Sequence, residues 1–128
     1  MLDTKYTIRI SLGDSEDKGN GTTPLNGGAA IKGMGSGSNI DFNPNSSGFD
    51  IVNSDGSTGR MAEIGLAHEL LHARKNKNGE HDEIKDENKI DPDTKQRGVL
   101  TKEEIQVRKE DSEIRKEQGQ KERAQPHN

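Results

Sequence analysis

The segment His68-Glu69-Leu70-Leu71-His72 holds two imidazoles and a carboxylate at a spacing typical of zinc-binding helices. In a helix, residues four positions apart are rotated by about 40° and displaced by about 6 Å, so both imidazoles project from one face. Each imidazole can bind a zinc ion through one ring nitrogen at about 2.0–2.1 Å. We therefore predict one zinc ion per chain, with His68 and His72 as ligands.

Glu69 stands beside the two histidines, where its carboxylate reaches a water molecule on the ion rather than the ion itself. Zinc lowers the pKa of such a water toward about 7 and polarises a substrate carbonyl as a Lewis acid. Glu69 can then take the proton as general base and later return it to the leaving amine. The segment thus predicts a zinc-dependent endopeptidase.

A catalytic zinc ion usually has three protein ligands and a water molecule, so one ligand is still to be found. The chain has no cysteine, and the position six residues after His72, a histidine in metzincins, is Asn78. Glu103 and Glu104 fall beside an apolar stripe of a second predicted helix, and a carboxylate on a core face needs a partner such as zinc. We prefer Glu104 as third ligand, with Glu103 as its rival. The alternative is that both acids cap the helix.

Further polar residues are candidates for two supporting roles. The side chain that stabilises the transition state is expected among Tyr6, His81 and Arg115. His81 is alternatively a ligand that swings to the metal, or a surface histidine. An acid two turns into the second helix is expected to orient a ligand imidazole. The candidates are Glu110, Asp111 and Glu113.

Residues 1–59 are the expected β-rich part of the molecule. Alternating apolar and polar residues over 6–12 and 39–42 indicate half-buried strands, and 49–52 is a third candidate strand. The polar, glycine-containing stretch 13–26 is expected to be a loop. The strand at 39–42 is expected to form the edge of the substrate cleft, where an extended peptide can add by main-chain hydrogen bonds.

An active-site helix is predicted over residues 60–75. Its apolar residues cover nearly every direction around the helix axis, which indicates that the helix is largely buried. Leu70 and Leu71 are expected to anchor it to the core. Gly65, about one turn before the first histidine, is expected to leave space near the metal.

The remainder of the chain predicts a ligand helix between two mobile segments. Residues 76–98 are rich in charge and are expected to form a solvated loop. Thr101 is the expected N-cap of a helix over 101–118. Residues 119–128 are expected to be a flexible tail.

The composition limits the class of protein. A length of 128 residues suggests a single metallopeptidase domain over 1–128, and 25% apolar residues predict a small core. The net charge of −4 argues against nucleic-acid binding. No apolar run reaches the roughly 20 residues of a membrane-spanning helix. The first residues lack the pattern of a signal peptide, so we expect a larger polypeptide or a dedicated secretion system to deliver this domain.

Three segments, in order, resemble NleD-type effector zinc metallopeptidases. The segment similar to the zinc segment of that family is Leu66-Ala67-His68-Glu69-Leu70-Leu71-His72-Ala73. Residues 35–44 are similar to the strand and turn before that helix, and residues 101–105 and 113–119 to the closing helix. The resemblance covers roughly residues 35–123. Many zincins share the zinc motif, whereas the ordered set of three segments is more specific.

The resemblance implies a protease that is secreted or injected into other cells and that acts on a protein or peptide. Other members of the family are toxin tips of Rhs-repeat proteins, for which a cognate immunity protein is an expected partner. The pair Glu103-Glu104 is also similar to that of clostridial neurotoxins, in which the second glutamate binds zinc, and this favours Glu104. The expected fold is α+β and zincin-like, with a small N-terminal β-sheet packed on the active-site helix and a second, C-terminal helix.

Three alternatives compete with the endopeptidase. A zinc amidase acting on cell-wall peptide would use the same chemistry. A non-enzymatic interaction module would bind a partner through its charged helices and hold a structural zinc, with His81 as a possible fourth ligand. The third alternative is a disordered, charge-rich tail with a chance motif. An open position on the metal would favour an enzyme over the module.

Overall fold

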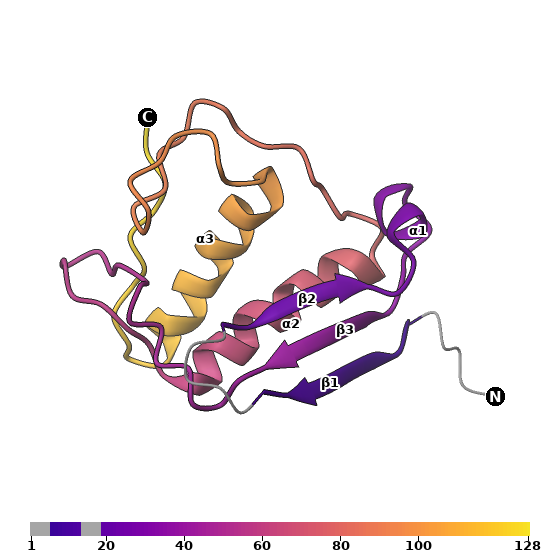
Figure 1. The fold of residues 1–128 in the computed structure, drawn as a ribbon, viewed down its shortest axis with the longest axis horizontal. Helices are drawn as coiled ribbons and strands as arrows, with labels where there is room; N and C mark the ends of the chain where they lie inside the picture. The colour runs from indigo at the N-terminus through magenta and orange to yellow at the C-terminus, as the bar shows by residue number, and fades with distance from the viewer. Residues whose placement is uncertain (1–5, 14–18) are drawn as a thin grey trace.

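Strands and helices both form in the described part of the chain, residues 6–13 and 19–128 of the computed structural model. The α+β class predicted from the sequence is therefore confirmed. In chain order the elements are β1 (Ile8–Leu12), β2 (Gly21–Pro24), α1 (Gly27–Ile31), β3 (Ser38–Phe42), α2 (Ala62–Lys77) and α3 (Lys102–Glu117). Helix α2 lies across one side of the sheet, and α3 lies beside α2 (Figure 1).

The sheet has the strand order β1-β3-β2, with β1 parallel and β2 antiparallel to β3. Strand β3 is therefore central, and the prediction that residues 39–42 form the cleft edge is wrong. The outer strand on that side is β2, inside the stretch 13–26 that was expected to be a loop. Its sequence, Gly-Thr-Thr-Pro, has no apolar alternation. Pro24 suits an outer strand because proline has no N–H to donate, and an outer strand has a neighbour on one side only.

Of the three strands, only the central strand β3 has fully buried residues. Ser38 and Ile40 are 0% exposed, and the Asn76 side-chain amide of α2 donates to the Ser38 hydroxyl (2.8 Å). Ile8 and Ile10 of β1 pair with Ser38 and Ile40 and share their face, yet they are 45% and 50% exposed. The prediction of a half-buried first strand is thus wrong, because α2 covers β2 and β3 rather than the far edge of the sheet.

Helix α2 is buried along one continuous half of its surface rather than all round. The buried residues are Ile64, Gly65, His68, Glu69, Ala73 and Asn76. Leu70 is 38% exposed, so it does not anchor the helix as predicted. The sheet and α3 cover adjoining parts of this face, and Leu70 lies on the opposite side of the helix.

Gly35 allows the chain to pass the C-terminal end of α2. Its φ of +80° is in the left-handed region, and a Cβ there would lie 2.1 Å from the carbonyl oxygen of Lys77. The Ser36 N–H donates to the carbonyl of Asn76 (2.8 Å). This close contact connects the start of β3 to the end of α2.

Helix α3 begins as predicted, with the Thr101 hydroxyl accepting from the Glu104 N–H (3.0 Å). The C-terminal residues pack on the molecule, where the sequence predicted a flexible tail. Arg123 is 6% exposed, the Ala124 N–H donates to the carbonyl of Val52 (2.9 Å), and His127 bridges to Ile90. Residues 49–52, a predicted strand, contribute only an isolated bridge from Val52 to Thr58.

Three alanines and four larger aliphatic residues form the core of the described part of the chain. They are Ala29, Ala30, Ile40, Ile64, Ala73, Leu100 and Val107. The buried charged residues, which include Asp111, Arg108 and Arg115, outnumber the four larger aliphatic residues of the core. In the described residues, no helix has the length and apolar character needed to cross a membrane.

Candidate metal centre

Helices α2 and α3 bring two imidazoles and a carboxylate to one point. His68, His72 and Glu104 each offer a ligand atom, and these atoms all lie within 4.8 Å of one another. Glu104 Oε1 is 2.9 Å from His68 Nε2 and 2.8 Å from His72 Nε2. The four-residue spacing of the histidines and the position of Glu104 in the first turn of α3 place all three on the facing sides of the two helices.

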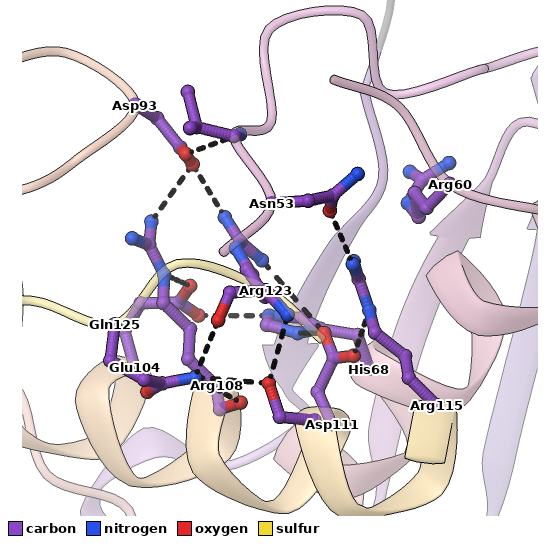
Figure 2. Close-up of polar contacts among 12 residues, drawn as sticks. Asn53, Arg60, His68, Asp93, Glu104, Arg108, Asp111, Arg115, Arg123 and Gln125 are labelled. Atoms are coloured by element: carbon purple, nitrogen blue, oxygen red, sulfur yellow. Dashed lines mark hydrogen bonds and ion pairs between the residues drawn. The ribbon is translucent and has the colours of Figure 1, made fainter. Parts of the chain in front are cut away.

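The other ring nitrogen of each histidine is held by a separate carboxylate. His68 Nδ1 is 2.8 Å from Asp111 Oδ2, and His72 Nδ1 is 2.5 Å from Glu103 Oε2. Figure 2 shows His68 between Glu104 and Asp111. An Nδ1–H that donates to a carboxylate fixes the ring orientation and leaves Nε2 as the metal-binding atom. Glu103, the rival third ligand, therefore lies on the outer side of His72, while Glu104 lies on the inner side.

The charges of the cluster are strongly coupled. Burial disfavours the charged form of His72, but hydrogen bonds to Glu103 and Glu104 outweigh it and raise the pKa of His72 to about 10. Against the same effect of burial, hydrogen bonds to Asp111 and Glu104 raise the pKa of His68. Burial raises the pKa of Glu104, yet hydrogen bonds to both histidines hold that pKa well below its ordinary value. The carboxylates around the two imidazoles thus favour the protonated, positively charged form of each ring.

Arg108 holds the second oxygen of Glu104. Its Nε donates to Glu104 Oε2 (2.7 Å), one turn along α3 (Figure 2). Its Nη1 donates to Asp91 Oδ1 (2.9 Å). Arg123 in turn donates to Asp93 (2.6 Å), which also accepts from the Val52 N–H. Segment 85–98 and the C-terminal residues are therefore connected to the carboxylate that faces the histidines.

Glu69 lies on the sheet side of the same cavity. The Thr22 hydroxyl of β2 donates to Glu69 Oε1 (2.8 Å) and also lies 3.1 Å from the Glu69 carbonyl oxygen. The side chains of Glu69, His68, His72 and Glu104 all line a cavity of about 550 Å³. The carboxylate is thus positioned beside the three-atom cluster but outside it.

The other predicted residues have different surroundings. His81 lines the cavity, but its two ring nitrogens lie 3.0 Å from Glu103 Oε1 and 3.1 Å from Glu83 Oε1, outside the cluster. Arg115 is 2% exposed and donates to Asp111 and Asn53, away from the cavity. Tyr6 is 41% exposed and does not line the cavity.

Of the three acids predicted to orient an imidazole, Asp111 does so. Glu113 is exposed, and Glu110 pairs instead with Lys75 (3.6 Å). Asp111 is nearly on the same face of α3 as Glu104 because seven residues make almost two turns.

Sequence reasoning missed Arg108, Thr22 and Arg60, which all line the cavity. The four-residue spacing from Glu104 to Arg108 is a signal for a helical ion pair, and it could have identified Arg108. Thr22 had no such signal, because its strand is not visible in the sequence pattern.

The donor set fits a zinc ion. Zinc in hydrolytic sites binds imidazole nitrogens and a carboxylate oxygen, and keeps a further position for water or substrate. Both Nε2 atoms and Glu104 Oε1 point to one place, and the remaining polar atoms of these side chains are already bound by Asp111, Glu103 and Arg108. The cluster borders an open cavity rather than a closed shell of protein.

The comparisons with known proteins give one family. The model of the Peptidase_M91 family, described as effector protein, matches residues 3–124. This span contains the whole cluster, the residues that hold it, and both helices. No curated protein and no solved structure matches the chain.

Proposed function

The chain belongs to the Peptidase_M91 family of effector proteins, and from this membership we propose that it is a zinc-dependent endopeptidase that is delivered into a target cell and cleaves protein there. The family indicates a peptidase and therefore a protein substrate. The term effector suggests delivery into host cells. The zinc chemistry and the residues that perform it are inferred from the site.

The observation that carries this proposal is the shared cavity of a three-atom donor cluster and a separate carboxylate. His68, His72 and Glu104 would hold the ion, and Glu69 stays free of it. A purely structural site would need its ligands closed around the ion, whereas these ligands border open space.

The ion, when bound, would supply Lewis acidity, which activates water and polarises the substrate carbonyl. Glu69 Oε1 or Oε2 would accept the proton of the attacking water and donate it to the leaving nitrogen. The Thr22 hydroxyl, 2.8 Å from Oε1, orients the Glu69 carboxylate. Thr22 belongs to the outer strand β2 and lines the cavity. The strand that orients the base therefore also borders the cavity.

Three residues would position the ligands without touching the substrate. Asp111 and Glu103 accept from the outer ring nitrogens of His68 and His72, and Arg108 binds Oε2 of Glu104. These contacts fix the rotation of each ligand side chain before the ion binds, which reduces the ordering that binding requires. His81 is the remaining candidate on the cavity wall for stabilising charge in the transition state.

Zinc stoichiometry tests the proposal directly. Elemental analysis of metal-replete protein should give one zinc per chain, with loss in His72→Ala and Glu104→Ala. Glu103→Ala should weaken binding without abolishing it. A zinc-free wild type would contradict the proposal, and equal loss in both glutamate variants would contradict the assignment of Glu104. Digests of protein mixtures and of purified peptidoglycan should then show cleavage of the protein alone.

A further inference from the structure

Arg60 places its guanidinium on the wall of the same cavity. It lies just before α2, is half-buried, and lines the cavity together with His68 and Glu69. Its Nη1 donates to the carbonyl of Ser46 (2.7 Å), and Nη2 lies 3.5 Å from the Ser46 hydroxyl. Within the part of the chain that the structure describes, it forms no ion pair with a carboxylate. Figure 2 shows it apart from the arginines that are paired.

The side-chain amide of Asn20 is a second donor at the same place. Its Oδ1 accepts the Asn43 N–H (2.8 Å), so the amide is oriented and Nδ2 faces the other way. Nδ2 is buried and has no hydrogen-bond partner. A buried N–H donor without an acceptor is costly, which suggests that an acceptor binds there in the working complex.

Gly65 allows both donors to lie against α2. A Cβ on Gly65 would lie 2.7 Å from Asn20 Nδ2 and 2.8 Å from Arg60 Nη2, so the two nitrogens approach one point. The sequence predicted that Gly65 leaves space near the metal, and these two donors occupy that space. Both nitrogens carry positively polarised N–H groups at this point, so one carboxylate bound there would accept from both.

We propose that Arg60 and Asn20 bind a carboxylate of the substrate and thereby set its specificity. The inference rests on the proposed peptidase function. Gly65 precedes Glu69 by four residues, or about 6 Å along the helix, and one extended substrate residue spans about 3.3–3.6 Å. The carboxylate therefore belongs to a residue one or two positions from the scissile bond. It is either an acidic side chain or the C-terminal carboxylate of the substrate.

Cleavage of a proteome-derived peptide library, read by mass spectrometry, provides the first test. Wild type should enrich Asp and Glu over Asn and Gln at one position near the scissile bond, or cleave at a fixed distance from free C-termini. The best peptide is then synthesised in four forms, with Glu or Gln at that position and with a free or amidated C-terminus. A loss on Glu→Gln assigns an acidic side chain, and a loss on amidation assigns the C-terminus. A wild type that cleaves without either preference overturns the inference.

Two variants connect the preference to the two donors. Arg60→Gln should lower kcat/KM for the carboxylate peptide by about tenfold or more while leaving the matched neutral peptide unchanged. Asn20→Asp keeps the acceptor for the Asn43 N–H and places a carboxylate beside Arg60, so it should give the same loss with an undiminished melting temperature. Arg74→Gln, which changes an exposed arginine of α2, is the control. Equal losses on both peptides would overturn the inference.

A binding measurement separates this site from the catalytic proposal. Labelled acidic peptides with free C-termini should bind the Glu69→Gln protein more tightly in fluorescence anisotropy than amidated counterparts with Gln and Asn in place of Glu and Asp. Arg60→Gln added to that protein should remove the difference. If wild type cleaves no peptide but this difference is present, the peptidase proposal fails and the carboxylate site stands. If cleavage occurs and the difference is absent, the reverse holds.

Discussion

Helix α2 makes two contacts of opposite character. Toward the central strand β3, it meets neutral groups: Ile40 is 0% exposed, and Asn76 donates to the Ser38 hydroxyl. Toward α3, it meets charge: His68 and His72 are surrounded by three carboxylates, and two arginines pair with those carboxylates in turn. One helix thus has a contact that stabilises the fold and a contact that forms the site.

The difference matters because the two contacts depend on different conditions. Removing apolar surface from water stabilises a fold with little dependence on pH or ions. Buried charges are costly to desolvate and stabilise only while each has its partner. The contact with α3 should therefore respond to protons, to metal and to single charge changes, while the contact with β3 should not.

The largest effect is expected from Glu69→Gln. The amide keeps the shape of the side chain and the contact with Thr22 but cannot accept a proton, so activity should fall about 10²–10⁴-fold. Zinc content and melting temperature should stay at wild-type values. Glu63→Gln, an exposed acid in the first turn of α2, is the matched control for peptidase assays. Full activity in the Glu69 variant would show that another group moves the proton.

Ile40→Ala should mainly affect stability. Deleting a fully buried side chain from the contact between sheet and helix should cost about 2–5 kcal/mol in the free energy of unfolding. Ile10→Ala, at the paired position of β1 and 50% exposed, should change it far less. Urea unfolding measures both, and zinc content per folded chain should stay constant. Equal costs would mean that β1 is covered in solution.

Glu103→Gln should weaken zinc binding without abolishing it. Gln still accepts from His72 Nδ1 but lacks the charge that raises the basicity of the imidazole, so zinc affinity should fall about 10–100-fold. Glu113→Gln on the exposed face of α3 should leave affinity unchanged. Competition titrations with a chromophoric chelator measure both. An unchanged affinity in the Glu103 variant would remove this carboxylate from the site.

The smallest effect is expected from a change of one pH unit. In the metal-free protein the folded pKa of His72 is raised to about 10 from an ordinary value of 6.5, so its contribution to stability is complete below pH 6.5 and is lost as pH rises toward 10. Zinc must displace that proton, so its affinity should rise with pH in the same window, by up to about 1.4 kcal/mol per pH unit for each proton released. The melting-temperature difference between zinc-loaded and chelator-treated protein should widen from pH 6.5 to 8.5. A constant difference would mean that the histidines are already neutral.

The fold could be predicted where one element has a strong local pattern. Helices α2 and α3 and strand β3 follow from periodicity and from the Thr101 cap. Strand β2 could not be predicted, because Gly21–Pro24 lacks alternation and is paired only through its backbone. The packed C-terminus was missed for a related reason. Arg123 looks like a residue of a solvated tail until its partner Asp93, 30 residues away, is known.

The sequence by itself determined the two histidines on one helical face, the adjacent Glu69, and an acidic pair at the start of α3. These follow from helix geometry within one element. Only the tertiary structure decided which acid of the pair faces both histidines, because that depends on how α3 is rotated against α2. It also decided that Asp111 orients His68, that Thr22 holds Glu69, and that Arg60 and Asn20 meet over Gly65. Each of these contacts joins residues from separate elements, and local pattern carries no information about their distance.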